Sequence, residues 1–266
     1  MRALSIRLGW VLFAAVLLLV LLGPELAPHS PSRPVGPPFA APGAVGLVGT
    51  DHLGRDVLSR MLHGGRPLLL TSALAALVGS AVGALAGLFA SLVAGSRRWA
   101  AALVLRPLDV LAAVPPILVL LLVLTALPDR TGLVLAVVLT GAPLTARVAR
   151  AAADQVLGRG HLEAAIARGE GWGWLLGREV LPLVAGPLLA DAVLRFVSAV
   201  YLAAAAGFLG LSGTDSDWGL LIVEALPGVS LQPWALLAPV LGIALLAVGT
   251  HFIADGAGRR ARSVIA

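Results

Sequence analysis

The chain has 266 residues, of which 59% are hydrophobic and only 12% are charged, and its formal net charge is +5. This composition is typical of an integral membrane protein and leaves little chain for a soluble domain. The basic residues lie between apolar runs and do not gather on one hydrophilic face, which argues against a nucleic-acid partner. All 19 basic residues are arginine and cysteine is absent, which excludes a lysine-containing phosphate-binding loop, disulfides and Cys-ligated metals.

We expect an all-α fold with about six transmembrane helices, because roughly 20 apolar helical residues cross a hydrocarbon layer of about 30 Å. The six stretches that are long enough lie at about Leu8–Leu26, Pro67–Ala94, Ala100–Leu127, Gly132–Ala153, Leu183–Leu211 and Trp234–Ala254. The first starts like a signal peptide, but its apolar run is long for that role, so we interpret it as a retained helix. Pro115, Pro116 and Pro143 lie inside the third and fourth stretches and predict kinks there.

The pattern divides the chain into three parts. Residues 1–66 hold the first helix, a Pro- and Gly-rich extracytoplasmic loop and an amphipathic helix. Residues 67–254 form a five-helix core with a polar loop at about 154–182, and residues 255–266 form a cytoplasmic tail. With the N-terminus inside, 13 arginines fall on the cytoplasmic side, 5 fall outside and Arg195 lies within a span. This asymmetry follows the positive-inside tendency and predicts that both termini are cytoplasmic.

The stretch GTDHLGRDVLSR, just before the second span, is unusually rich in charge for this chain. We expect it to form an amphipathic helix on the outer surface, with Asp51 capping its N-terminus and Gly64–Gly65 ending it. Asp51 with Arg55, and Asp56 with Arg60, are spaced i, i+4 and are expected to form exposed ion pairs. The role of this segment stays open between an interfacial helix, a gate and a contact for a partner outside the membrane.

Two further pairs of charged residues lie within or near the spans. Asp191 and Arg195 are spaced i, i+4 in the fifth span, where each can neutralise the other, either as a pair lining a transport pathway or as a structural pair. Arg106 and Asp109 lie near the inner end of the third span and are expected to reach the interface. The five histidines are scattered along the chain, so no structural metal site is expected.

The polar segment HLEAAIARGEGWGWLLGREVLPLVAGP joins the fourth and fifth spans. Its apolar positions predict a short amphipathic helix that Gly169 and Gly171 end, followed by a second apolar surface. One interpretation is an interfacial helical hairpin that only links two spans. The order of its residues also resembles the EAA loop of ABC-transporter permeases, the cytoplasmic element that docks into the ATPase subunit. The positions that match this loop are Glu163, Ala164, Ala165, Gly169, Leu181 and Pro182.

Four other segments resemble the C-type permease subunits of dipeptide, oligopeptide and nickel ABC importers. In chain order they read GTDHLGRDVLSRMLHGGRPLLL, RPLDVLAAVPPILVL, GFLGLSGTDSDWGLLI and FIADGAGRR. The extracytoplasmic motif matches at Gly49, Thr50, Asp51, Gly54, Arg55, Asp56, Ser59 and Arg60. The chain departs from this family at Ala203, where a glutamate is common, and at Glu179, where the family more usually has histidine, and these departures bear on the solute and the partners.

The resemblance implies the type I ABC importer permease fold in a prokaryotic cytoplasmic (inner) membrane. This chain and a homologous permease would form the pathway, two cytoplasmic ATPase subunits would bind ATP and Mg, and an extracytoplasmic protein would deliver the solute. The chain itself would bind no cofactor and no ATP. Di- or oligopeptides are the first solute class, and nickel or another small solute is the alternative. An ion-driven secondary transporter is a remote alternative because only Asp191 is an acid deep in a span, and an intramembrane enzyme lacks a recognisable site.

Overall fold

A computed structural model describes residues 14–94, 97–157, 160, 165, 167–211 and 213–265 of the chain. Within these residues helices dominate, and extended pairing is limited to two isolated bridges, which confirms the predicted all-α fold. A helical segment at residues 14–21 is followed, in chain order, by the helices α2 (Gly23–Leu26), α3 (Val57–Ala94), α4 (Arg98–Ala113), α5 (Pro116–Ala126), α6 (Arg130–Leu157), α8 (Trp172–Trp174), η1 (Leu175–Val180, a π-helix), α9 (Leu181–Phe208), α10 (Trp218–Ala225), η2 (Leu226–Gly228) and α11 (Pro233–Ile265).

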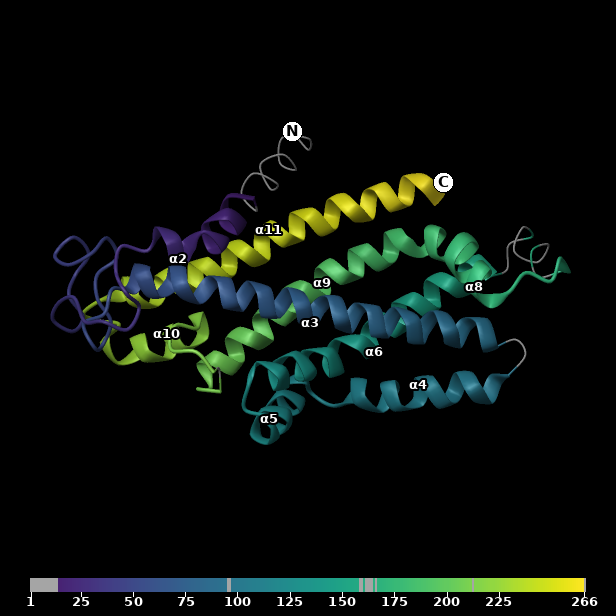
Figure 1. Cartoon of the computed structure of the whole chain (residues 1–266), viewed down its shortest axis with the longest axis horizontal. Helices are drawn as coiled ribbons and strands as arrows, with labels where there is room; N and C mark the ends of the chain where they lie inside the picture. The colour runs from purple at the N-terminus through teal and green to yellow at the C-terminus, as the bar shows by residue number, and fades with distance from the viewer. Residues whose placement is uncertain are drawn as a thin grey trace.

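Four of the described helical stretches are long and apolar enough to cross a membrane: α3, α6, η1 with α9, and the first part of α11 (Figure 1). The bent pair α4 and α5 is a fifth if it counts as one span. The predicted first span begins within residues 1–13, which lie outside the described part of the chain. The five later predicted stretches each coincide with one of these helices, and α11 continues as helix through most of the predicted tail.

The third predicted span is broken at its two prolines. The axes of α4 and α5 differ by 97°. Val114 and Pro115 adopt extended backbone, with ψ of 130° at both residues. A residue before proline is driven away from the helical region, and proline has no N–H to donate, so Pro115 ends one helix and Pro116 starts the next. The predicted kink is therefore a sharp corner.

Small residues let α3 and α6 pack closely, and these two helices share the largest contact in the described fold. Gly83 and Gly87 of α3 face the backbone of α6, where an added Cβ would collide with the carbonyl oxygens of Ala142 and Ala146. Glycines four residues apart lie on one helix face, so the pattern brings the two backbones into contact. This contact fixes the frame against which α9 and α11 pack.

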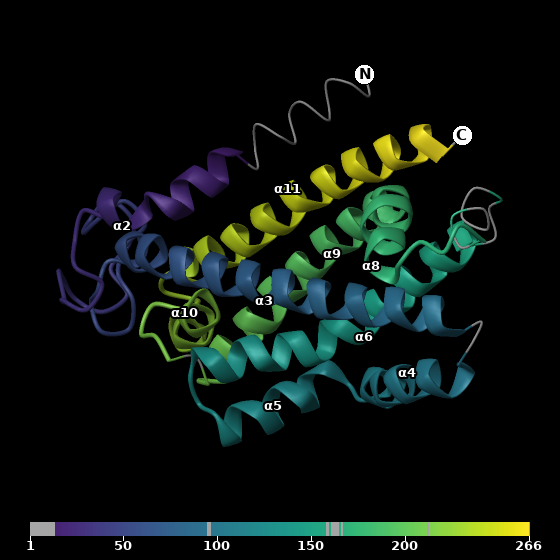
Figure 2. The ribbon, with the colours of Figure 1, turned by 45° about the vertical axis from the view of Figure 1, so that its right-hand side comes forward.

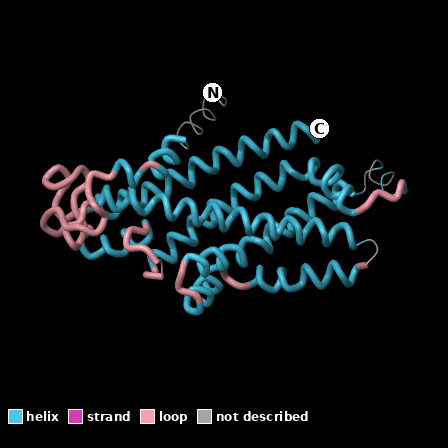
Figure 3. The backbone as a smooth tube through the Cα atoms, viewed as in Figure 1, coloured by secondary structure: helices cyan, strands magenta, loops and turns pink. Residues whose placement is uncertain are grey.

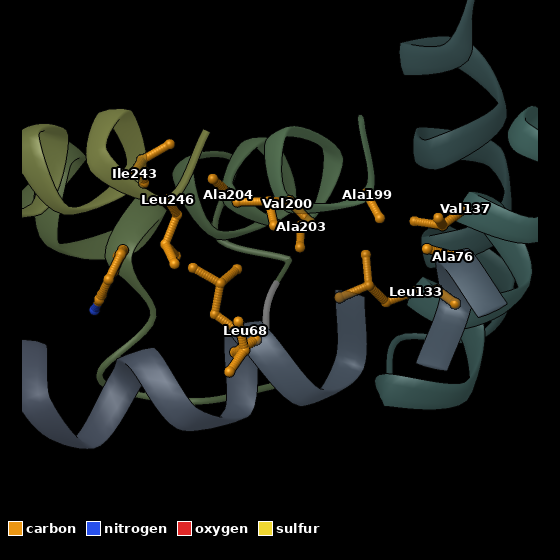
Figure 4. Close-up of a cluster of buried hydrophobic side chains, with 14 of the residues drawn as sticks. Leu68, Ala76, Leu133, Val137, Ala199, Val200, Ala203, Ala204, Ile243 and Leu246 are labelled. Atoms are coloured by element: carbon orange, nitrogen blue, oxygen red, sulfur yellow. The ribbon is translucent and has the colours of Figure 1, made fainter. Parts of the chain in front are cut away.

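The main hydrophobic core lies between α3, α6, α9 and α11 (Figure 4). Leu68 of α3, Leu133 of α6, Val200 of α9 and Leu246 of α11 are among its buried side chains. Figure 2 shows α3, α9 and α11 running lengthwise through the molecule, with α4 and α5 along one side. Loops gather at both ends (Figure 3). We call the end that carries residues 27–56 and α10 the loop end, and the opposite end the α8 end.

The prediction of a separate surface helix over Gly49–Arg60 is wrong. Residues 51–56 are irregular, α3 starts at Val57, and it continues through Gly64–Gly65 without a break. Asp56 caps α3, because its carboxylate accepts a hydrogen bond from the backbone N–H of Ser59 at 3.1 Å. A Cβ at Gly64 or Gly65 would collide with Ser216 or Trp218 of the neighbouring segment, so close packing and not helix termination explains these glycines.

Candidate functional site

The charged stretch at the loop end forms a buried network. The carboxylate of Asp51 accepts hydrogen bonds from the backbone N–H groups of Leu53 and Arg55 at 2.8 and 2.9 Å. It also accepts from Arg55 Nε at 2.8 Å and from Arg60 Nη1 at 2.6 Å. Arg60 is fully buried and also donates to Glu224 Oε2 at 2.5 Å and to the carbonyl of Asp215. The network therefore ties the loop and α3 to α10.

These contacts correct the predicted pairing. Asp51 and Arg55 do pair, but both are buried instead of exposed. Asp56 does not hold Arg60 with its carboxylate, which instead binds Ser59 Oγ at 2.5 Å and lies 3.4 Å from His29 Nδ1. Burial raises the pKa of Asp51, but the backbone N–H groups and the charge of Arg60 outweigh it and hold the pKa below its ordinary value.

Sequence reasoning missed Glu224, which completes this network. Its side chain lies 3.3 Å from Arg55 and 2.5 Å from Arg60. The missed signal is that Glu224 is the only charged residue of the apolar helix α10, and a carboxylate in such a helix needs a partner. The partner, Arg60, lies 164 residues away in the sequence, so local spacing could not identify it.

The remaining residues of the motif shape the backbone around these charges. Thr50 is buried, and its hydroxyl donates to the carbonyl of Pro37 and accepts from the N–H of Ala40. Gly49 and Gly54 have positive φ angles of 87° and 74°, which favour glycine. The structure therefore brings the whole motif together, with Asp51 and Arg60 at its centre.

Asp51, His52 and Glu224 offer ligand atoms within 4.8 Å of one another. Carboxylate and imidazole are suitable ligands for a divalent metal ion. However, the guanidinium groups of Arg55 and Arg60 already bind oxygens of both acids, and these two positive charges disfavour a cation at the same position. The chemistry of this cluster fits a network of ion pairs better than a metal centre.

Asp217 caps α10 at the same end of the molecule. Its carboxylate accepts from the N–H of Gly219 at 2.8 Å. Burial raises its pKa to about 6, although the N–H groups of Gly219 and Leu220 act in the opposite direction. Asp217 was not among the predicted site residues, although an aspartate directly before an apolar helix is a common capping signal.

The predicted pair in the fifth span forms halfway along α9. Arg195 lies 14 residues from Leu181 and 13 from Phe208, about 20 Å from either end at roughly 1.5 Å per residue. Its Nη2 atom is 3.2 Å from Asp191 Oδ1, and Asp191 Oδ2 accepts the hydroxyl of Thr145 at 2.6 Å. Asp191 is thus satisfied by two partners.

A cavity of about 100 Å³ lies beside Arg195, between α3, α6, α9 and the start of α5. Among the described residues, Arg195 is the only charged one that lines it. The other lining residues are Ala75, Ala76, Gly79, Ser80, Pro116, Val137, Thr140, Gly141, Leu144, Ser198, Ala199 and Leu202. Thr140 and Ser198 bond to carbonyls of their own helices, whereas Ser80 Oγ and Arg195 Nε are buried without a hydrogen-bond partner in the described part of the chain. Two side chains that line this cavity, Ser80 and Arg195, therefore each carry a buried polar atom without a described hydrogen-bond partner.

A second ion pair lies nearer the α8 end. Arg147 of α6 binds Asp109 of α4 at 2.9 Å, and both side chains are 55% exposed. Leu144, which lines the cavity, precedes Arg147 by three residues and is also exposed, so both lie on one face of α6. An exposed charge pair on two helices of a membrane bundle favours a surface that meets water or protein instead of lipid.

The polar segment at the α8 end is described in part. Glu163 and Ala164 lie outside the described residues, whereas Ala165 is fully buried. Gly169 has a φ of +79° and no described atom near the position of a Cβ, which agrees with the predicted end of the short helix. The chain then re-enters the bundle through η1 and α9, which starts at Leu181 with Pro182 in its first turn.

The fold and these features define a multi-pass membrane protein with an irregular, polar-rich segment at each end. The sequence profile of the family described as "binding-protein-dependent transport system inner membrane component" matches residues 79–263. The chain therefore belongs to this family of ABC importer permeases.

Relatives match along nearly the whole chain. The di/tripeptide transport system permease protein DppC of Pseudomonas aeruginosa is 33% identical, over 94% of this chain and 85% of that protein. The probable D,D-dipeptide transport system permease protein DdpC of Escherichia coli is 30% identical, over 92% of this chain and 83% of that protein. An inward-facing structure of the MetNI methionine ABC transporter has a TM-score of 0.64 at 17% identity, over 76% of this chain and 95% of that chain. This likeness confirms the type I importer permease fold.

Proposed function

We propose that this chain is a permease subunit of a peptide importer and carries di- or oligopeptides together with a second, homologous permease. The observation that carries this proposal is the match to relatives named as di/tripeptide and D,D-dipeptide permeases, which extends over more than nine-tenths of the chain. The match to these relatives includes the loop end as well as the spans. Peptide is therefore the first solute class to test.

The loop end is proposed to be extracytoplasmic and the α8 end cytoplasmic, which puts both chain termini inside. The arginine asymmetry supports this orientation, since 13 of 19 arginines then lie on the cytoplasmic side. A solute-binding protein would meet the loop end. The buried network of Asp51, Arg60 and Glu224 would hold that surface rigid against α10. A single-cysteine accessibility scan tests the orientation, because the chain has no cysteine of its own.

The α8 end is proposed to dock onto two cytoplasmic ATPase subunits, through residues Glu163 to Gly169. The lack of lysine supports ATP and Mg binding by those partners, since the phosphate-binding loop of such ATPases needs one. Closure of the ATPases would push a short packed helix as a rigid body and turn the spans from outward- to inward-facing. This chain then contributes the pathway and the mechanical coupling, and no cofactor of its own.

The decisive experiment reconstitutes the complete transporter in proteoliposomes. Uptake of a radiolabelled dipeptide is measured with and without ATP and the binding protein, and ⁶³Ni²⁺ uptake is measured in the same vesicles. We expect peptide uptake that needs ATP and the binding protein. Nickel uptake without peptide uptake would instead establish the alternative solute. Uptake driven by an ion gradient in the absence of ATP would overturn the importer mechanism itself.

A further inference from the structure

The geometry around Arg195 points to a binding site for the carboxylate group of the transported peptide, halfway along the spans. This inference rests on the proposed function, because it names the group of the solute that the cavity would recognise. The cavity volume of about 100 Å³ exceeds the roughly 10–15 Å³ that one water needs. There is therefore room for a carboxylate group and the atoms next to it.

The one described charged group that lines the cavity suits an anion. Arg195 is the one ionisable residue that lines it in the described structure, and the remaining lining residues are apolar or neutral polar. Asp191, the acid that pairs with Arg195, is absent from the lining. It binds Nη2 of Arg195 and accepts the hydroxyl of Thr145, which leaves Nε of Arg195 without a described partner. Asp191 therefore acts as a positioning residue that holds the guanidinium in place.

Two donors at this cavity are left unsatisfied. Nε of Arg195 and Oγ of Ser80 are buried and have no hydrogen-bond partner among the described residues. Buried polar groups are nearly always hydrogen-bonded, so two such atoms at one cavity indicate a missing acceptor. A carboxylate has two acceptor oxygens and suits the N–H groups of a guanidinium, with a hydroxyl as a further donor.

The depth of the site suits a transported solute. Arg195 lies in the middle of α9, while Ser80, Gly79 and Leu144 lie near the middle of their own long helices. An arginine at this depth is unfavourable toward lipid and is found facing a polar cavity or the bundle interior. Leu144 lines the cavity and is partly exposed, so the site opens toward the face of α6 that also carries Arg147. A peptide passing along that face would meet Arg195.

The test compares neutral and charged versions of this pair in the complete transporter with its binding protein. Asp191→Asn/Arg195→Gln removes both charges together, so no uncompensated charge stays buried. We expect this variant to assemble and to keep ATP hydrolysis stimulated by the binding protein. Loss of one charge-assisted hydrogen bond weakens binding by about 10- to 100-fold, so dipeptide taken up per ATP should fall. The matched control is Glu25→Gln/Arg66→Gln, which neutralises an exposed pair of 3.0 Å at the loop end.

A second variant tests the charge itself. Asp191→Asn/Arg195→Cys introduces the only thiol of this chain and is assembled with cysteine-free partners. Reaction with 2-aminoethyl methanethiosulfonate should restore uptake per ATP, because it returns a cation to the cavity, whereas the anionic 2-sulfonatoethyl reagent should not. Equal uptake with both reagents, or a thiol that neither reagent reaches, would overturn the site.

Two outcomes of the first comparison count against this inference alone. One is that the transporter with the neutral pair takes up as much dipeptide per ATP as the wild type. The other is that the variant with the neutral pair fails to assemble while the control variant assembles, because the role of Arg195 is then structural. Failure of the proposed function looks different, since the wild-type transporter would then take up no dipeptide at all.

Discussion

Arg60 Nη1 and Glu224 Oε2 lie 2.5 Å apart although the two residues are separated by 164 positions in the sequence. Arg60 also bridges to Asp51 at 2.6 Å, so one buried cation serves two acids on two different elements. The side chain of Arg60 is fully buried, whereas Glu224 keeps 22% of its side chain exposed. Arg60 thus joins Asp51 and α3 to α10, and Arg55 pairs with the same two acids.

Arg60→Met should destabilise the protein strongly. The change leaves Asp51 and Glu224 close together, with fewer positive partners, and removing one partner of a buried ion pair typically costs about 3–5 kcal/mol. We expect a large drop in the melting temperature of the purified chain in detergent, and faster proteolysis within residues 27–56. Arg66→Met is the matched control, because its pair with Glu25 is exposed and should contribute about 1 kcal/mol or less. Equal melting temperatures for the two variants would contradict a stabilising role for the network.

The sequence predicts the long helices well and the loop end poorly, and the reason is distance along the chain. The spans of α3, α6, α9 and α11 follow from the length of each apolar run, which is a local property. The start of α3 cannot be predicted from a local property, because Asp51 and Asp56 are equally good capping residues and tertiary contacts decide which of them caps the helix. Likewise, the prolines predict a break after α4 but not its 97° size, which depends on packing against α6.

The burial of the charged residues also escapes local reasoning. The i, i+4 spacing of Asp51 and Arg55 predicts their pairing, and the pair forms at 2.8 Å. Its burial involves distant parts of the chain, such as Glu224 of α10, which lies 3.3 Å from Arg55. The same limit applies to Arg195, whose pairing with Asp191 is local, while the cavity beside it is formed by α9 together with α3, α5 and α6. Spacing therefore predicts pairs, and only the fold shows what surrounds them.

Asp217→Asn should remove a pH dependence of stability that falls between about pH 4 and pH 6. The pKa of Asp217 is raised from 3.8 to about 6 in the folded protein, so between these values the folded state binds a proton that the unfolded state does not. The stabilising contribution of this group is therefore complete below about pH 4 and is lost as the pH rises through about 6. The shift corresponds to at most about 3 kcal/mol at roughly 1.4 kcal/mol per pH unit.

The measurement is the melting temperature of the wild type and the Asp217→Asn variant in detergent from pH 4 to 8. The asparagine side chain keeps an acceptor oxygen for the N–H of Gly219, so the cap remains while the titration disappears. The melting temperature of the wild type should rise relative to that of the variant as the pH falls. A difference that is flat across this range would show that Asp217 titrates normally.

Gly83→Ala should weaken the packing of α3 on α6. A Cβ at this position meets the carbonyl oxygen of Ala142 and the side chain of Thr145, and overpacking of a close contact typically costs about 1–3 kcal/mol. Gly177→Ala is the control, because no described atom lies near its Cβ position and alanine favours helical backbone. We expect a lower melting temperature only for Gly83→Ala. Equal melting temperatures of both variants would mean that α3 and α6 can move apart at this contact without a loss of stability.

Gly169→Trp should uncouple ATP hydrolysis from uptake in the proposed importer. The space around Gly169 is open within the described part of this chain, so we expect a bulky side chain there to collide with a docked partner. Its φ of +79° adds strain for any residue other than glycine. We therefore pair the variant with Gly169→Asn, since asparagine tolerates this conformation and carries a small side chain. The measurement is dipeptide uptake per ATP hydrolysed in proteoliposomes.

A position control separates docking from general bulk at this end of the protein. Gly173→Trp adds the same side chain four residues further on, where the space is also open. We expect hydrolysis without uptake for Gly169→Trp and near-normal coupling for Gly169→Asn and Gly173→Trp. Loss of coupling in Gly169→Asn as well would show that the effect of Gly169→Trp does not come from the bulk of its side chain. Normal coupling in a stably assembled Gly169→Trp transporter would place the ATPase contact elsewhere, because an indole at a docked surface cannot be accommodated without moving the partner.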